Sequence, residues 1–426
     1  MKRKLFHIKF RSLFIACVVL LAIPLTIKGI RYYQRLEEQI PASCYDSIAL
    51  AYQFTNVRSL IHIGNEQDAL RVRNEIIQTI WKNGHLPTSL PSKITRNIPN
   101  PIPELKNVSS VDEIDINLPE SGTTYQFNAV VYFFHPAHDA NKLMIFHQGH
   151  ADTLQVFGGF DTIQFFLNRD YSVLGFFMPL TGPNRTTNPR ITGRGSDGMN
   201  QMAALETETF NPLEIFLDPL PITLKYIKQN YTFSTISMIG VSGGGWTTTL
   251  YAAIDPGIQY SYPVAGSLPL FLRTPPCKDS GDWEQSGPSL YKKIDYMDLY
   301  ILGAYGKGRI QVQMLNHYDN CCFEGIRYLT YENIVKSIVN KLRKGDFDVF
   351  LDSSFRYDHK ISLYALEHVF PSIPTPFTIT KTVSSSLMTA ATLATGCDQS
   401  AFSLDVYTDT LPKILPPLTG AFSNRR

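Results

Sequence analysis

The chain has 426 residues, of which 44% are hydrophobic and 18% are charged, and its formal net charge is +2. A chain this close to neutral has no overall basic field of the kind that attracts nucleic acid, so we expect no nucleic-acid partner. The length suits one large domain with additions, or two domains.

The amino end differs in composition from the rest of the chain. Residues 1–12 contain five Lys or Arg and no acidic residue, and residues 13–27 carry no charge. We interpret 1–12 as a cytoplasmic tail and 13–30 as a signal anchor, with the remainder of the chain extracytoplasmic. The apolar run is shorter than the roughly 20 residues of a full span, so a cleaved secretory signal and a secreted protein are the alternative.

The chain holds six cysteines, one of them within the apolar run. An extracytoplasmic compartment permits disulfides, and because five cysteines lie outside that run, at least one is unpaired or pairs between chains. The spacing of Cys and His does not match a structural zinc site. We therefore expect neither a metal nor a cofactor.

Residues 31–105 are predicted to form a short helical preface and a proline-rich linker. Apolar residues recur at helical spacing over 68–83, and prolines between 87 and 103 end that pattern. At the other end of the chain, residues 372–426 are rich in Ser, Thr and Pro, which is typical of a loosely ordered tail.

Residues 106–371 are predicted to form an α/β domain. After an opening hairpin, strands and helices alternate, which indicates a mostly parallel sheet flanked by helices. The expected strands cover 111–118, 125–134, 142–146, 171–177, 236–239, 260–265, 309–315 and 348–351, and the expected helices 153–167, 211–230, 246–253, 331–342 and 361–369.

The stretch 179–210 interrupts this alternation. It has neither the helical nor the strand period, and it follows a parallel strand at the edge where binding sites form. A stretch this long is typical of a lid or binding loop, and a disordered surface insert is the alternative.

Gly240-Val241-Ser242-Gly243-Gly244 is the stretch that carries chemistry. It matches G-x-S-x-G between a predicted strand and a predicted helix, which is the context of a nucleophile elbow. Such a turn presents the Ser242 hydroxyl above the sheet and points the Gly243 N–H at negative charge that forms on a substrate.

A serine nucleophile needs a histidine base and an orienting carboxylate. In the chain order serine, acid, histidine, both partners lie in loops after later strands, which selects Asp319 and His359. Asp352 and Asp358 are the other candidate acids, and His368 is the other candidate base. The loop His147-Gln148-Gly149-His150 follows the third strand, and we expect Gly149 or His150 to supply a second oxyanion donor.

Residues 111–370 resemble secreted or membrane-anchored α/β-hydrolases of the esterase and peptidase type. The resemblance rests on His-Gln-Gly-His, Gly-Val-Ser-Gly-Gly-Gly-Trp, Tyr-Asp-Asn and Asp-His-Lys-Ile-Ser, which occur in the family order. It implies an eight-stranded sheet and hydrolysis through a serine acyl-enzyme, and we expect the substrate to be an ester. A peptidase, and a catalytically silent hydrolase fold used for binding, are the alternatives. The oxyanion loop departs from the family's His-Gly-Gly-Gly.

Overall fold

The computed structural model describes residues 40–120, 123–138, 141–277, 279 and 281–370. The expected signal anchor at 13–30 and the expected tail at 372–426 lie outside these residues. In the part of the chain that is described, no helix is long and apolar enough to cross a membrane.

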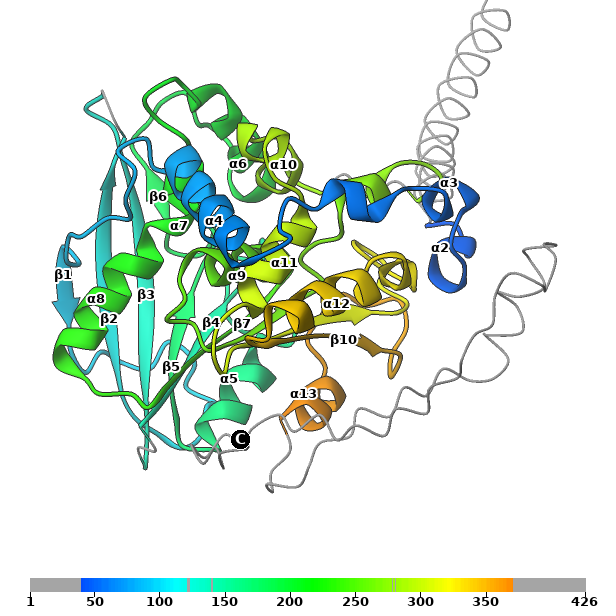
Figure 1. Cartoon of the computed structure of the whole chain (residues 1–426). Helices are drawn as coiled ribbons and strands as arrows, with labels where there is room; N and C mark the ends of the chain where they lie inside the picture. Colours follow the sequence, from blue (N-terminus) through cyan, green and yellow to red (C-terminus); the bar gives the residue numbers. More distant parts are fainter. Residues whose placement is uncertain (1–39, 121–122, 139–140, 278, 280, 371–426) are drawn as a thin grey trace, which may run out of the picture. The chain divides into compact units, whose positions relative to one another are not determined.

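A ten-stranded sheet forms the centre of the molecule (Figure 1). Its strands run in the order β1-β2-β3-β5-β4-β7-β8-β9-β10, with β6 paired to β3. The bounds are β1 Lys93–Thr95, β2 Val108–Pro119, β3 Gln126–Pro136, β4 Lys142–His147, β5 Tyr171–Phe176, β6 Arg185–Thr186, β7 Thr235–Val241, β8 Tyr260–Val264, β9 Ile310–Asn316 and β10 Asp346–Asp352.

The sheet changes from antiparallel to parallel along its width. β1, β2, β3 and β5 pair antiparallel, and every pair from β5 through β4, β7, β8 and β9 to β10 is parallel. The expected opening hairpin and mostly parallel sheet are therefore confirmed. The expected count of eight strands is two short because β1 and β6 are brief additions beside β2 and β3. This arrangement agrees with the fold that the sequence resemblance implies.

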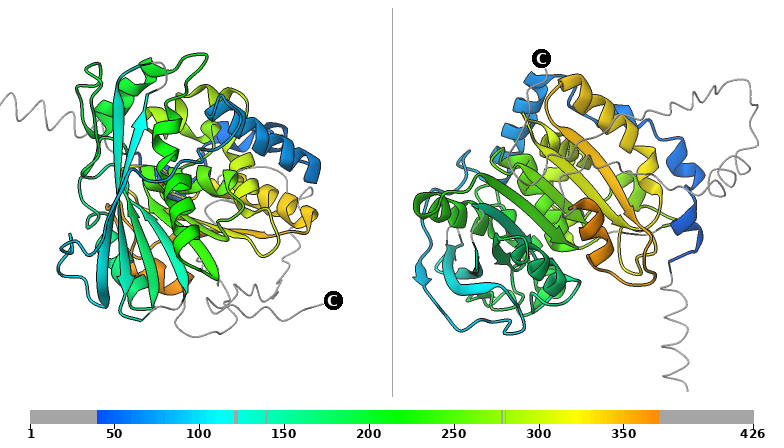
Figure 2. Two further views of the ribbon diagram at one scale, coloured as in Figure 1. Left: turned by 90° about the vertical axis from the view of Figure 1, so that its left-hand side faces the viewer. Right: turned by 90° about the horizontal axis from the view of Figure 1, so that it is seen from below.

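Helices cover both faces of the sheet (Figure 2). On one face, α5 and α13 pack against each other over a cluster that includes Phe146, Val241 and Phe370. On the other face, α9 packs against α11, and α11 packs against α12. The helices are α2 Ser43–Asp46, α3 Leu50–Gln53, α4 Glu66–Ile80, α5 Gly159–Leu167, α6 Gly195–Met202, α7 Leu213–Leu217, α8 Pro219–Asn230, α9 Gly243–Ile254, α10 Trp283–Ser286, α11 Tyr296–Ala304, α12 Glu332–Leu342 and α13 Leu363–Val369.

Two expectations about local structure need correction. The helix predicted over 211–230 is two helices, α7 and α8, which meet at Asp218-Pro219, because proline is tolerated in a first helical turn but not in a helix interior. The stretch 179–210 has regular structure after all: β6 pairs with β3, and α6 follows. In the same stretch, Arg194 pairs with Asp152 at 2.6 Å.

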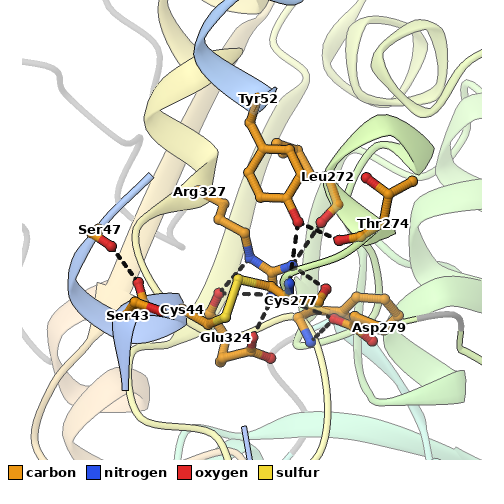
Figure 3. The surroundings of a disulfide bond; sticks show 11 residues. Ser43, Cys44, Ser47, Tyr52, Leu272, Thr274, Cys277, Asp279, Glu324 and Arg327 are labelled. Carbon is orange, nitrogen blue, oxygen red and sulfur yellow. Dashed lines mark hydrogen bonds and ion pairs between the residues drawn. A yellow bond between two sulfur atoms is a disulfide. The ribbon is translucent and has the colours of Figure 1, made fainter. Parts of the chain in front are cut away.

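The segment from residue 42 to 105 belongs to the same compact unit as the sheet. Asn65 caps α4 by accepting the Asp68 N–H at 3.0 Å, so the helix begins two residues before the expected position. A disulfide joins Cys44 to Cys277, across 233 residues of sequence (Figure 3). The preface is thereby bonded covalently to the loop that follows β8.

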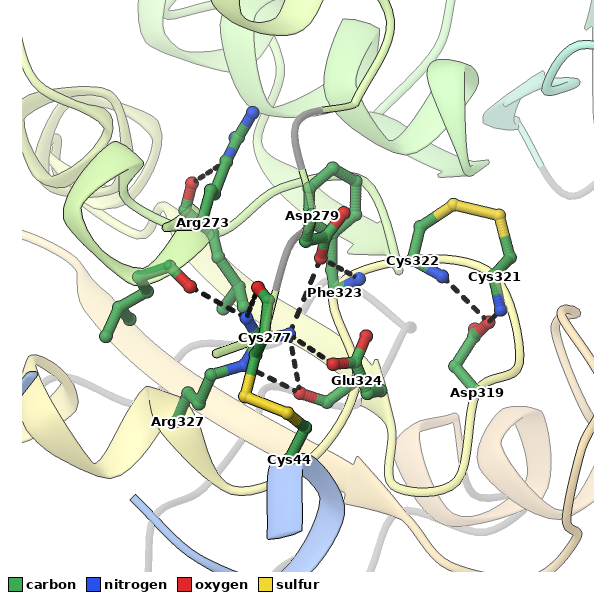
Figure 4. Close-up of polar contacts among 12 residues, drawn as sticks. Cys44, Arg273, Cys277, Asp279, Asp319, Cys321, Cys322, Phe323, Glu324 and Arg327 are labelled. Carbon is green, nitrogen blue, oxygen red and sulfur yellow. Dashed lines mark hydrogen bonds and ion pairs between the residues drawn. A yellow bond between two sulfur atoms is a disulfide. The ribbon is translucent and has the colours of Figure 1, made fainter. Parts of the chain in front are cut away.

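A buried arginine fixes the loop after β8 to the loop after β9. The Arg327 guanidinium donates to the carbonyls of Leu272 and Cys277 at 2.7 and 3.3 Å and to the Glu324 carboxylate at 2.7 Å (Figures 3 and 4). Asp279 pairs with the same guanidinium at 3.5 Å. Removing one of these partners would destabilise the fold, because it would leave a buried charge uncompensated.

Candidate active site

Ser242 lies in a sharp turn between β7 and α9. Its φ of 59° and ψ of −126° are rare for a residue with a side chain. The flanking glycines allow the turn: a Cβ at Gly240 would lie 2.2 Å from the Gly244 carbonyl oxygen, and one at Gly244 would lie 2.0 Å from that of His147. The chain thus has the backbone of a nucleophile elbow at the predicted serine.

The structure brings His359 and Asp319 together. The parallel strands β9 and β10 are neighbours, so the loops after them meet at one edge of the sheet. There His359 Nδ1 lies 2.7 Å from Asp319 Oδ2. His359 Nε2 is buried and has no hydrogen-bond partner among the described residues. With Nδ1 as the donor, Nε2 carries the lone pair that a base requires.

Four donors orient the Asp319 carboxylate. Oδ2 accepts from His359 and from Asn316 Nδ2, the latter at 2.9 Å. Oδ1 accepts the backbone N–H groups of Cys321 and Cys322 at 2.8 and 3.2 Å (Figure 4). Such an arrangement fixes the position of the carboxylate and the plane of the imidazole beside it.

The other candidate acids bond elsewhere. Asp352 accepts the Ser354 N–H at 2.9 Å and the Ser362 hydroxyl, and so closes the turn between β10 and α13. Asp358 pairs with Lys360 at 2.6 Å and accepts the backbone N–H, not the ring, of His359. His368 is exposed on α13, with Nδ1 bonded to the Tyr364 carbonyl.

The loop after β4 lies directly against the elbow. A Cβ at Gly149 would be 2.7 Å from the Ser242 Cβ, so only glycine fits there. The Gly149 N–H, however, donates to Gln148 Oε1 at 2.9 Å and is already occupied. The N–H groups of Gly243 and His150 donate to no acceptor among the described residues. Of the three expected oxyanion donors, these two have free N–H groups.

The His150 side chain has both ring nitrogens engaged. Nδ1 lies 3.2 Å from Asp282 Oδ2, and Nε2 lies 3.1 Å from Glu284 Oε1. Burial acts to lower the pKa of His150, but the hydrogen bond and charge of Glu284, with the charge of Asp282, outweigh it and raise the pKa. The ring also lies over the elbow, since a Cβ at Gly243 would be 2.7 Å from its Cε1.

The sequence pattern did not identify Asp282 and Glu284 as site residues. They lie at the start of α10, where Asp282 forms a capping box with Gln285. The pattern of a capped short helix is readable from the sequence, but it carries no information about which distant loop the helix contacts.

Two clusters of described residues place three potential metal ligands within 4.8 Å of one another. One is His150, Asp282 and Glu284, and the other is Cys321, Cys322 and His359. In the first cluster the carboxylates approach opposite nitrogens of one ring, which suits a protonated histidine better than a shared ion. In the second cluster the two sulfur atoms are joined in a disulfide.

Comparison with known proteins gives structural likeness without sequence similarity. No protein-family model matches the chain, and no curated protein sequence matches it. An acetyl xylan esterase from Paenibacillus sp. R4 is similar over 76% of this chain and 98% of its own, with 13% identity and a TM-score of 0.46. Acetyl xylan esterase 1 from Thermoanaerobacterium sp. is similar over 73% and 94%, with 13% identity and a TM-score of 0.44. The Pyrococcus furiosus esterase Pf2001 is similar over 67% and 94%, with 13% identity and a TM-score of 0.38.

Proposed function

We propose that the protein is a serine hydrolase that cleaves an ester through an acyl-enzyme. The observation that carries the proposal is the pairing of His359 Nδ1 with Asp319 at 2.7 Å, with Nε2 left buried and unpartnered, in a chain whose Ser242 occupies an elbow. The lone pair of this nitrogen can accept a proton, which is what a serine nucleophile requires of its base.

The roles follow from the donors and acceptors. His359 Nε2 takes the Ser242 hydroxyl proton as Oγ attacks the carbonyl carbon, and Asp319 stabilises the imidazolium. The N–H groups of Gly243 and His150 donate hydrogen bonds to the carbonyl oxygen as negative charge develops on it. The imidazolium then gives its proton to the leaving alkoxide, and a water molecule, activated in the same way, releases the acid.

Substrate and location extend this proposal. An ester is the preferred small-molecule substrate and a peptide bond the alternative. The basic residues 1–12 and the uncharged run 13–27 favour attachment to a membrane through the amino end, with the hydrolase domain extracytoplasmic, or otherwise secretion.

The test uses a fluorophosphonate probe, which labels an activated serine. The full chain should become labelled and should hydrolyse short acyl esters, and Ser242→Ala should lose both. The loss should be several orders of magnitude, because the hydroxyl is the nucleophile. Ser234→Ala is a matched control, because it removes a serine hydroxyl from the opposite end of β7. A folded wild-type chain that neither labels nor hydrolyses any ester or peptide would establish the silent binding protein instead.

A further inference from the structure

The adjacent cysteines Cys321 and Cys322 lie beside the proposed base. Their backbone N–H groups hold Asp319, and their sulfur atoms form a disulfide (Figure 4). Cys321 is exposed and Cys322 is half-buried, so a reductant in solution can reach the bond. The proposed mechanism uses the peptide groups of these two residues and makes no use of their sulfur atoms.

Both sulfur atoms and one ring nitrogen of His359 lie within 4.8 Å of one another. Two thiolates and an imidazole are ligands that zinc and cadmium prefer, and three protein ligands leave a fourth position for water. The partner of His359 strengthens the assignment. A histidine that binds metal usually donates its other N–H to a carboxylate. His359 Nδ1 already donates to Asp319 at 2.7 Å, so the lone pair of Nε2 is the one available to a metal ion.

We propose that reduction of the Cys321–Cys322 disulfide opens a binding site for a soft divalent metal ion, formed by Cys321, Cys322 and His359. A dithiol reductant supplies two electrons and two protons, the S–S bond breaks, two thiols form, and the reductant becomes its own disulfide. Metal binding then releases both thiol protons to solvent.

The consequence for hydrolysis rests on the proposed function. A metal ion on His359 occupies the lone pair that would accept the Ser242 proton, so the metal-bound form cannot activate its nucleophile. The site thereby makes the enzyme active when the pair is oxidised and inhibited by metal when the pair is reduced.

The experiment measures cadmium binding to the purified full chain before and after treatment with a phosphine reductant. Cys17→Ser and Cys397→Ser are introduced first, so that new thiols come only from the two disulfides. The reduced chain should bind an equimolar amount of Cd²⁺ with the ultraviolet charge-transfer band of a cadmium thiolate, and the oxidised chain should show no band. The Cd²⁺ affinity should fall by at least about 10-fold in His359→Gln, the smaller loss seen when only a supporting partner is removed.

Matched variants separate the two disulfides. Cys321→Ser/Cys322→Ser should abolish the band and keep the backbone N–H groups that hold Asp319, whereas Cys44→Ser/Cys277→Ser should retain it. The proposal would be overturned by a band that remains in Cys321→Ser/Cys322→Ser, or by a Cd²⁺ affinity that is unchanged in His359→Gln. Hydrolysis is scored separately: a chain that binds cadmium as described but cleaves nothing contradicts the proposed function and leaves the metal site standing. In an active chain, fluorophosphonate labelling that persists with cadmium bound would rule out His359 as a ligand.

Discussion

The candidate active site contains two histidines, His359 and His150, and they differ in the number of their carboxylate partners. His359 has one carboxylate, Asp319, on Nδ1, and its Nε2 has no partner among the described residues. His150 has a carboxylate on each nitrogen, Asp282 and Glu284. The first arrangement leaves a lone pair free, and the second uses both nitrogens as donors.

Under the proposed mechanism, this difference gives the two histidines different roles. A single carboxylate selects the tautomer of a neutral imidazole and so prepares a base. Two carboxylates favour the imidazolium, which has no lone pair left to accept a proton. His150 can therefore supply a positive charge and a fixed backbone N–H beside Ser242, but it cannot replace His359.

The largest expected effect separates the two histidines directly. His359→Gln should lower kcat by about 10⁴- to 10⁶-fold, because a glutamine cannot accept the serine proton. His150→Gln should cost less than about 100-fold, since its backbone N–H remains in place. Steady-state ester hydrolysis by both variants, with circular dichroism as the control for folding, measures the gap. Equal losses in the two folded variants would contradict the division of roles.

The second-largest effect is expected for Asp319, the single carboxylate partner of His359. Asp319→Asn should reduce kcat by about 10⁴-fold. The amide must turn its oxygen either to the His359 ring or to the N–H groups of Cys321 and Cys322, and in both orientations a donor faces a donor.

Asp352→Asn is the matched control for that substitution, because it changes the same residue type one strand away. It should lower the free energy of unfolding by about 1–3 kcal/mol through the Ser354 and Ser362 contacts, with less than a tenfold change in kcat. Denaturant unfolding and kinetics on both variants test this. A deeper kinetic loss in Asp352→Asn would remove Asp319 from its proposed role.

The smallest expected effect is on the pH dependence of stability, through His150 and its two carboxylate partners. The pKa of His150 is raised in the folded chain, so its pairing stabilises the fold fully below the unfolded pKa of about 6.5 and is lost as pH rises through the folded pKa. The wild type should therefore exceed His150→Gln in Tm at about pH 6, and the difference should narrow toward about pH 9. Thermal scans across that range provide the measurement. A difference that widened with pH would mean that His150 is held neutral.

Local sequence predicted the elbow well because its cause is local. Gly240 is required by the carbonyl of Gly244 within the same turn. Gly244 is required by the carbonyl of His147 in the loop after β4, so only its place in the G-x-S-x-G spacing is local. Asp319 and His359 were predictable for a different reason. Strand order places their loops together, and only one Asp after β9 stands at the right point in the chain.

The features that escaped prediction depend on contacts between distant segments or on a single rotamer. The approach of α10 to His150 joins residues 134 positions apart and leaves no periodic pattern. The pairing of the cysteines could not be deduced, because several connectivities fit the same spacing. The sequence pattern favoured Gly149 as an oxyanion donor, but its N–H donates to the Gln148 side chain, and that contact depends on the rotamer of Gln148.

The Cys44–Cys277 disulfide determines how the molecule responds to a pull on its amino end. Force applied through residues before Cys44 passes across the covalent bond to Cys277, bypassing α3 and α4 and the strand β1. The Cys277 carbonyl accepts a hydrogen bond from Arg327, which follows β9 in the same connection that carries Asp319. In the oxidised chain, tension applied before Cys44 therefore reaches the loop after β8 without first unfolding α3, α4 or β1.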